Sequence, residues 1–372
     1  MSSRRPSPAP KRTVPIKRAD GDPLTRVDIQ YDVLNAIFND SRTVFTNPYV
    51  AATQENPPPK LTFHDLYIKA VLNSSKATKA LRDKMNDSSL FAEDFAMLAM
   101  LVNVGRINTT MSFFPEMKTA IRTYHPIPAL QRSNGNLQDA PRIKHILKAS
   151  LLEGETKNAP STPSDVLARG KAGQVPATSI MNLIFVLANH SVPVGHQHFP
   201  EQSFDFLDIF LRTDISSASR ARAFLYLCYH YLESSTAETA EDDYDGEAAT
   251  NPFTDSNRGK GPILVVITPA EVAKENVEPE DERIRKENLV AQRSRIVSSQ
   301  SKGKAAAGGD EDEEMAGSGA EETKPKAGGS KRTTAHKEKK ATTDKVRKKA
   351  VKSKRHVESG DEEDISAQSL CF

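Results

Sequence analysis

The amino-acid sequence predicts an all-α fold, and three observations lead to this prediction. Apolar residues recur at steps of three and four, aromatic residues gather in the centre of the chain, and only one short run favours a strand. Of the 23 Phe and Tyr residues, 20 lie within residues 24–233, and the chain has no Trp. Because burial of such side chains must offset the loss of conformational entropy, the rest of the chain is not expected to fold. We therefore predict a helical core domain at residues 24–233.

The first expected helix covers residues 25–40. Thr25 can cap its first turn, and Asp28 places an acid where the positive end of a helix favours it. Apolar residues at helical spacing then mark a single face that can be buried against the core. These residues are Val27, Tyr31, Leu34 and Phe38.

Later segments repeat these signals. Thr62 and Asp65 form a second helix start, and residues 89–104 are apolar almost all round, which predicts a helix at the centre of the core. Gly105 can end that helix in the left-handed conformation. Further helices are expected at residues 142–152, directly after residues 161–165, and at residues 178–190, 203–211 and 217–233.

Proline-rich loops interrupt the core domain. Prolines predict an extended loop over residues 46–60, because each disfavours helix in the residue before it. A second loop at residues 125–136 could separate an N-terminal half, residues 24–125, from a C-terminal half, residues 140–233. One domain and two packed helical halves are both compatible with this pattern.

The net charge of +2, from 51 basic and 49 acidic residues, hides an uneven distribution. Residues 1–23 carry a net charge of +4, and the core domain carries +2. Residues 234–282 carry −10, and residues 283–372 carry +6. The sequence therefore predicts a disordered basic N-terminal arm, an acidic linker and a long disordered C-terminal tail of mixed charge with basic clusters.

Two elements of the acidic linker can contact a protein surface. Residues 262–269 contain the one strand candidate, and this apolar segment either docks back on the core or adds to the sheet of a partner. Asn251, Pro252 and Phe253 form a candidate partner-binding element. Asn-Pro-Phe is also an endocytic ligand motif, a use that the nuclear character of the tail disfavours.

The composition excludes several classes of protein. Cys228 and Cys371 cannot form a disulfide framework, and two cysteines fit a reducing compartment. Residues 1–18 are rich in Arg, Lys and Pro, unlike a secretory signal, and no apolar run approaches the ~18–20 residues of a membrane span. We expect a soluble intracellular protein located in the nucleus.

Enzymatic and metal sites are not expected. The sequence contains no phosphate-binding loop, and Gly-x-Ser-x-Gly is absent from the core domain. We therefore predict no catalytic residue, no cofactor and no small-molecule substrate. A histidine-rich region lacks the paired spacing of zinc ligands, so the His-x-His pair at residues 196 and 198 is expected to be exposed in a loop and the cysteine of the region to be buried. The residues of this region are His190, His196, His198, Cys228 and His230.

Basic clusters in the tail predict nuclear localisation and contacts with the DNA backbone without sequence preference. Acidic blocks at residues 310–314 and 361–364 can screen these clusters, bind histone tails or solvate the chain. Ser359 precedes acids and resembles an acid-directed kinase site, where phosphate would add negative charge. Basic residues at 142–148 form either a local patch for nucleic acid or a solvated helix face, and the general weakness of charge runs as signals favours the solvated face. The candidate DNA-contact and localisation residues are Lys345, Arg347, Lys348, Lys349, Lys352, Lys354 and Arg355.

Several blocks of sequence resemble the Ino eighty subunit one family. The longest covers residues 101–126, and the others are residues 138–144, 182–190 and 220–225 and the Asn-Pro-Phe element, so the resemblance covers roughly residues 20–268. It implies an accessory, non-catalytic subunit of a fungal Ino-eighty-type chromatin-remodelling complex, whose ATPase motor belongs to a separate subunit. It also implies a place in a peripheral module that touches extranucleosomal DNA and regulates the motor.

This resemblance suggests how the protein works. The core domain would bind other subunits, and the tail would contact DNA or histones. A candidate partner-binding turn consists of Arg106, Asn108, Phe113, Phe114 and Pro115. The alternative is that the two phenylalanines belong to the core and that the Arg and Asn cap helices. A rival function, a stand-alone nuclear DNA-binding transcription regulator, is disfavoured by the nearly neutral core domain.

Overall fold

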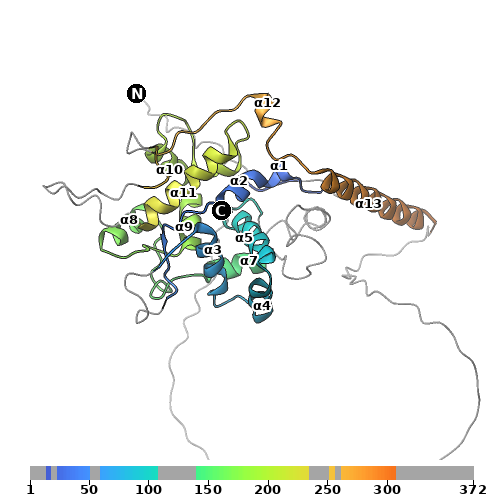
Figure 1. The fold of residues 1–372 in the computed structure, drawn as a ribbon. Coiled ribbons are helices and arrows are strands. Elements are labelled where there is room, and N and C mark those ends of the chain that lie inside the picture. The colour runs from blue at the N-terminus through green and yellow to red at the C-terminus, as the bar shows by residue number, and fades with distance from the viewer. Residues whose placement is uncertain are drawn as a thin grey trace, which may run out of the picture. The chain divides into compact units, whose positions relative to one another are not determined.

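A computed structural model of the chain describes residues 14–17, 23–50, 59–107, 140–233, 251–255 and 261–306. All of these residues belong to one compact unit, Met1–Gly309. Helices dominate the unit, which confirms the expected all-α class (Figure 1).

The chain enters this unit through two short helices rather than one. α1 (Arg26–Ile29) begins with the expected capping box, in which the Asp28 amide donates to Thr25 Oγ1 and the Thr25 amide donates to Asp28 Oδ2. α2 (Tyr31–Phe38) follows directly. Between them Gln30 has a left-handed backbone, with a φ of 53°, so the single helix expected over residues 25–40 is divided. Gln30 is buried, and its side-chain amide donates to the Val27 carbonyl at 2.6 Å.

Most of the remaining helices begin at a capping Ser, Thr or Asp, as the start signals indicate. Thr62 accepts a hydrogen bond from the Asp65 amide, and Ser179 accepts one from the Asn182 amide. Two helices, α4 and α10, were not expected from the sequence. The helices are α3 (Phe63–Leu72), α4 (Lys79–Asp87), α5 (Ser89–Asn103), α7 (Ala140–Lys148), α8 (Pro163–Lys171), α9 (Ile180–Asn189), α10 (Ser191–His198), the 3₁₀ helix η4 (Phe206–Phe210) and α11 (Ser217–Glu233).

Two long helices organise the hydrophobic core. α5 packs against α3, α4 and α7, and its residues from Phe95 to Asn103 are all buried, as its all-round apolar sequence predicts. α11 packs against α2, α8 and α9. Because α9 also contacts α3, α5 and α7, the N-terminal and C-terminal halves share one hydrophobic cluster.

A short strand pair closes the loop predicted at residues 46–60. β1 (Phe45–Thr46) pairs antiparallel with β2 (Lys60–Leu61), with Phe45 opposite Leu61. Glu233, at the end of α11, accepts hydrogen bonds from the Thr46 amide at 2.8 Å and from Lys60 Nζ at 2.5 Å. The pair is thereby fixed to α11.

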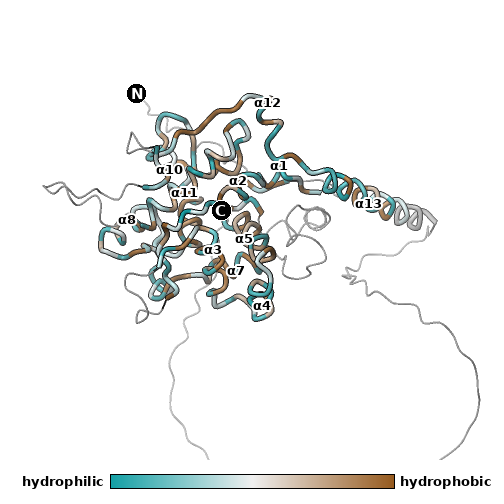
Figure 2. The backbone as a smooth tube through the Cα atoms, in the orientation of Figure 1, coloured by the Kyte–Doolittle hydropathy of each residue, from teal (hydrophilic) through white to brown (hydrophobic). Residues whose placement is uncertain are grey.

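After α11, residues 261–279 form a segment that we call the strap. It pairs with the residues before α11: the Ser216 amide donates to the Val265 carbonyl, and the Ile267 amide donates to the Asp214 carbonyl, both at 2.9 Å. Leu264 is buried, whereas Ile263, Val265 and Val266 are exposed, and Figure 2 shows this run in brown ahead of α12 (Pro269–Val272). The apolar segment thus contacts the core of its own chain.

A long helix follows the strap. α13 (Glu280–Ala306) occupies residues that the sequence analysis assigns mainly to a tail without structure. Its first turn contains Glu280 and Asp281, which favour the positive helix end, and Arg283 pairs with both Glu280 and Glu287 at helical spacing. These local charges stabilise a helix even though its apolar residues lack a regular face.

The side chain of Arg220 connects four separate elements. It is fully buried on α11, and its Nη1 donates to Gln30 Oε1 at 2.8 Å and to the Ile209 carbonyl at 3.0 Å. Nη2 donates to Ser217 Oγ at 3.0 Å and lies 3.6 Å from the Glu275 carboxylate of the strap. Burial lowers the pKa of Arg220 to about 10, and Glu275 offsets part of that change. The residue therefore remains charged at neutral pH.

Replacing Arg220 with Met should reduce the free energy of unfolding by about 3 kcal/mol or more, because Gln30 and Glu275 lose their buried partner. Urea unfolding measures this change. The matched control is Arg212→Met. Arg212 pairs with the half-exposed Asp214 and should contribute less than about 1 kcal/mol. Equal losses in the two variants would contradict the central role of Arg220.

Candidate functional site

The structure describes four of the residues that sequence analysis assigns to partner binding. They are Arg106, which follows α5, and Asn251, Pro252 and Phe253, which precede the strap. The other candidates, Asn108, Phe113, Phe114, Pro115, the basic cluster from Lys345 to Arg355 and Ser359, lie outside the described residues.

Arg106 is engaged within its own chain. Its Nη1 donates to the Val14 carbonyl at 2.6 Å, and Nη2 donates to the Asp28 carbonyl at 2.7 Å. Its own carbonyl accepts a hydrogen bond from the Ile16 amide at 3.0 Å. Burial lowers the pKa of Arg106, and Asp28 offsets part of this effect. The sequence suggested that Arg106 either binds a partner or caps a helix. Its hydrogen bonds all lie within the chain, as a capping role requires.

The Asn-Pro-Phe element forms a tight turn. Asn251 Oδ1 accepts a hydrogen bond from the Phe253 amide at 3.1 Å, and the Asn251 carbonyl accepts one from the Thr254 amide at 3.0 Å. Asn at the first position and Pro at the second are the residues that such turns prefer. The sequence of this element therefore determines its local shape.

The turn is seated on the helical core through Phe253. This ring is fully buried; it stacks on Phe45 of β1 with a centroid distance of 6.2 Å and meets Tyr229 of α11 edge-on at 6.4 Å. The guanidinium of Arg42 also lies over this ring, 4.5 Å from its centroid. Complete burial of such a ring contributes about 2 kcal/mol. We call this place the Phe253 pocket.

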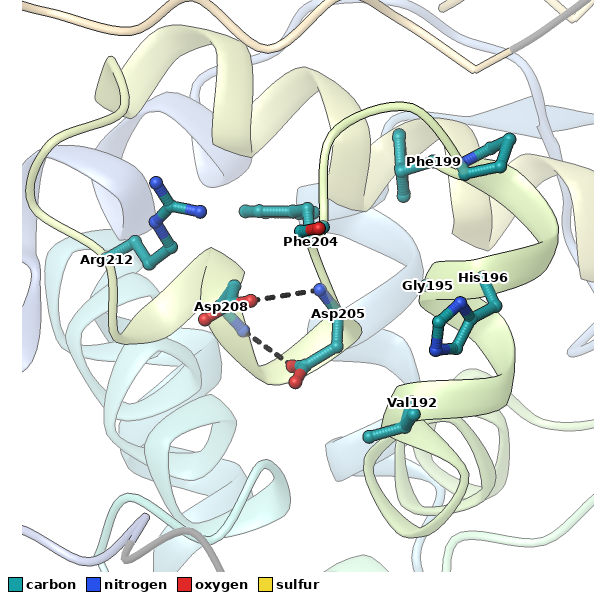
Figure 3. A pocket seen from close by; sticks show the side chains of 10 residues that line it. Val192, Gly195, His196, Phe199, Phe204, Asp205, Asp208 and Arg212 are labelled. Carbon is teal, nitrogen blue, oxygen red and sulfur yellow. Dashed lines mark hydrogen bonds between the residues drawn. The ribbon is translucent and has the colours of Figure 1, made fainter. Parts of the chain in front are cut away.

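A second site is a cavity of about 540 Å³ beside α10, which sequence analysis did not predict. Two carboxylates stand in its wall, and Figure 3 shows them joined through the backbone: the Asp205 amide donates to Asp208 Oδ2 at 3.0 Å, and the Asp208 amide donates to Asp205 Oδ1 at 3.1 Å. These bonds form the capping box of η4. In the sequence, the three-residue spacing of Asp205 and Asp208 is the pattern of a capping box, and it indicates this cap of η4. The lining residues are Val192, Gly195, His196, Phe199, Pro200, Ser203, Phe204, Asp205, Asp208 and Arg212.

At the end of α10 a histidine is buried among aromatic side chains, contrary to the expectation of an exposed loop. His198 ends α10, and its ring nitrogens lie 3.0 Å from the Tyr231 hydroxyl and 3.4 Å from the Tyr226 hydroxyl. The His230 ring lies 4.7 Å away between centroids. Burial, and secondly His230, lower the pKa of His198 to about 3. The ring is therefore neutral across the physiological range.

Other chemical signals within the described residues are weak. Cys228 is fully buried, and burial raises the pKa of its thiol, as its apolar neighbours in the sequence indicate. No group of three or more His, Cys, Asp or Glu side chains in the described ranges is arranged to hold a metal ion. No helix in this part of the chain combines the length and the apolar character needed to cross a bilayer.

The fold and these sites are those of a helical protein that binds a turn of its own chain. Comparison with known proteins identifies its family. The model of the Ino eighty subunit 1 N-terminal domain matches residues 6–297. The Ino eighty subunit 1 of Emericella nidulans is 40% identical over 300 residues, which cover 77% of this chain and 36% of that protein. The Ino eighty subunit 1 of Saccharomyces cerevisiae is 32% identical over 206 residues, which cover 47% of this chain and 30% of that protein.

The chain therefore belongs to the Ino eighty subunit 1 family, which confirms the resemblance seen in the sequence. It spans about a third of the length of the curated relatives that it matches. No solved structure matches the chain.

Burial of His198 predicts a pH-dependent contribution to stability. Its pKa in the folded chain, about 3, lies below the ordinary 6.5, so the unfolded chain binds the proton more tightly between these values. The benefit of a neutral ring is complete above pH 6.5 and declines as the pH falls toward 3, by at most about 1.4 kcal/mol per pH unit. The stability deficit of His198→Gln relative to the wild type should therefore shrink between pH 6.5 and 4.

Urea unfolding at several pH values measures this difference. The comparison must be made between variants, because Asp94 acts in the opposite direction: burial, and secondly Glu93, raise its pKa to about 7. His196→Gln, which alters an exposed histidine of the same helix, should show a pH profile parallel to that of the wild type. A parallel profile for His198→Gln would contradict the prediction.

Proposed function

We propose that the protein is a non-catalytic accessory subunit of an Ino-eighty-type, ATP-dependent chromatin-remodelling complex and that it acts in the nucleus. The observation that carries this proposal is membership in the Ino eighty subunit 1 family, with a match over residues 6–297. The relatives are named as subunits, which supports a role inside an assembly.

A scaffolding role for the helical core fits its physical character. Residues 24–233 carry a net charge of only +2, so long-range attraction to DNA is weak and this surface is suited to protein contacts. The polar groups that line the cavity also support a structural role. Asp205 and Asp208 are hydrogen-bonded in the cap of η4, and Arg212 pairs with Asp214.

The candidate turn after α5 remains part of this proposal. Arg106 anchors the backbone at residues 14 and 28, so it would position the turn rather than contact a partner itself. Asn108, Phe113, Phe114 and Pro115 would make the contacts with another subunit. Phosphorylation of Ser359 would weaken tail contacts with DNA by adding negative charge near the basic cluster.

Affinity purification of the full chain from its native cells tests subunit membership. We expect a remodelling ATPase and actin-related proteins to co-elute in stoichiometric amounts. The complex should withstand nuclease treatment, because the contacts between the core and other subunits would not depend on DNA. Absence of the ATPase from the purified material would overturn the proposal.

DNA contact through the tail has a separate test. Replacing the seven basic residues of the cluster from Lys345 to Arg355 with Gln should weaken binding to random-sequence duplexes. The slope of log K against log salt should also become shallower, by about 0.9 for each phosphate that the tail no longer neutralises. Fluorescence anisotropy between about 50 and 200 mM salt measures both changes. Replacing Arg142, Lys144 and Lys148 of α7 should leave binding unchanged, and an unchanged slope in the tail variant would contradict the assignment.

A further inference from the structure

We propose that the helical core contains a recognition site for peptides with an Asn-Pro-Phe turn. In this chain residues 251–255 fill the site, and the same sequence supplied as a separate molecule would fill it once the internal copy is removed. This inference is independent of the proposed function, because it rests on contacts between the turn and the core.

The site first recognises an aromatic ring. Phe45 stacks on Phe253 with an interplanar angle of 27°, and Tyr229 approaches at 62°. Arg42 lies over the same ring, 4.5 Å from its centroid, where a cation and an aromatic face attract each other. Because Phe253 is fully buried, the pocket selects an aromatic side chain and excludes water from around it.

The site also binds the backbone carbonyls on both sides of the ring. Arg42 Nη1 donates to the Pro252 carbonyl at 3.1 Å. Arg222 Nε donates to the Phe253 carbonyl at 2.9 Å, and its Nη2 donates to the Thr254 carbonyl at 2.6 Å. Three consecutive carbonyls are therefore held by two arginines of the core. Ordinary packing of a linker against a domain does not require such matched donors.

The site also selects the type of residue that precedes the proline. Asn251 Nδ2 donates to the Tyr226 carbonyl of α11 at 3.0 Å, while Asn251 Oδ1 accepts from the Phe253 amide. An aspartate could accept the second bond but could not donate the first, so the site distinguishes Asn from Asp. Pro252 suits the second position of the turn, where its fixed φ lowers the entropy lost on binding.

The site also binds an acidic side chain of the ligand. Arg222 Nη1 lies 2.5 Å from the Asp255 carboxylate, two residues after the phenylalanine. Asp40, 3.7 Å from Arg42, balances the other guanidinium within the core. The ligand is therefore an Asn-Pro-Phe turn followed by an acid, the composition of residues 251–255.

Because the internal copy occupies the site, it competes with any free peptide. Covalent attachment gives residues 251–255 an effective concentration on the order of millimolar, so a free peptide of micromolar affinity would not displace them at ordinary concentrations. A partner that carries the same turn would bind only after release of the internal one. A partner that recognises Asn251, Pro252 and Phe253 directly would likewise have to extract Phe253 from its pocket.

The test uses the full chain and a fluorescein-labelled peptide with the sequence of residues 248–258. Phe253→Ala empties the pocket, so fluorescence anisotropy should show peptide binding at least about tenfold tighter than to the wild type. A peptide with Ala in place of the phenylalanine should not bind. Equal, weak binding of the peptide to the wild type and to a folded Phe253→Ala variant would overturn the proposal.

Two further variants locate the binding on the proposed surface. Adding Arg222→Ala to Phe253→Ala should weaken peptide binding at least about tenfold, because two carbonyls and the acid lose their donor. Adding Arg212→Ala, which alters an arginine paired with Asp214, should leave binding unchanged. Circular dichroism and thermal unfolding establish that each chain is folded.

If Phe253→Ala does not fold, Asn251→Ala provides the same test, since it weakens the internal turn while retaining the ring. Peptide binding to this variant should again exceed binding to the wild type. Loss of the preference for the variant, or binding that survives Arg222→Ala, would contradict the assigned site.

Discussion

The described structure depends on the burial of one arginine. A guanidinium without water is costly unless its donors meet acceptors. Arg220 Nη1 and Nη2 meet acceptors from four places in the chain, whereas its buried Nε has no hydrogen-bond partner among the described residues. One of them, Gln30, is available only because its backbone is left-handed and divides the first helix. Another, Glu275, lies much later in the chain, within the strap. The break between α1 and α2, the position of η4 and the return of the strap thus share one electrostatic cause.

The strap shows how later residues complete the helical core. Glu275 accepts hydrogen bonds from the Ser217 amide and hydroxyl, and Asn276 exchanges hydrogen bonds with Asp32. Residues 251–255 add a third aromatic ring against Phe45 and Tyr229, which also contact each other. The end of the most apolar region, residue 233, is therefore not the end of the packed structure.

Local features were predictable from the sequence because they depend on neighbouring residues. The caps at Thr25, Thr62 and residues 161–165 and the burial of α5 follow from spacing alone. The division at Gln30 was not predictable, because its cause is an arginine 190 residues away. Burial of His198 depends on Tyr226 and Tyr231 of another helix. The Asn-Pro-Phe element was visible as a motif, but its receptor is assembled from two distant segments, residues 42–45 and α11, so the sequence could not indicate that the chain binds its own turn.

The ion pair between Arg26 and Glu282 has a consequence for chain topology. Its two members are 256 positions apart, and their side chains meet at 2.7 Å in a bidentate contact. The ion pair therefore closes residues 26–282 into a loop through electrostatic attraction rather than through a covalent bond. A competing anion or cation that captures either partner opens this loop at the ion pair, whereas the hydrogen bonds between Asp32 and Asn276 still join the same two regions of the chain. Breaking the ion pair would therefore loosen the contact between α1 and α13 without separating the strap from α2.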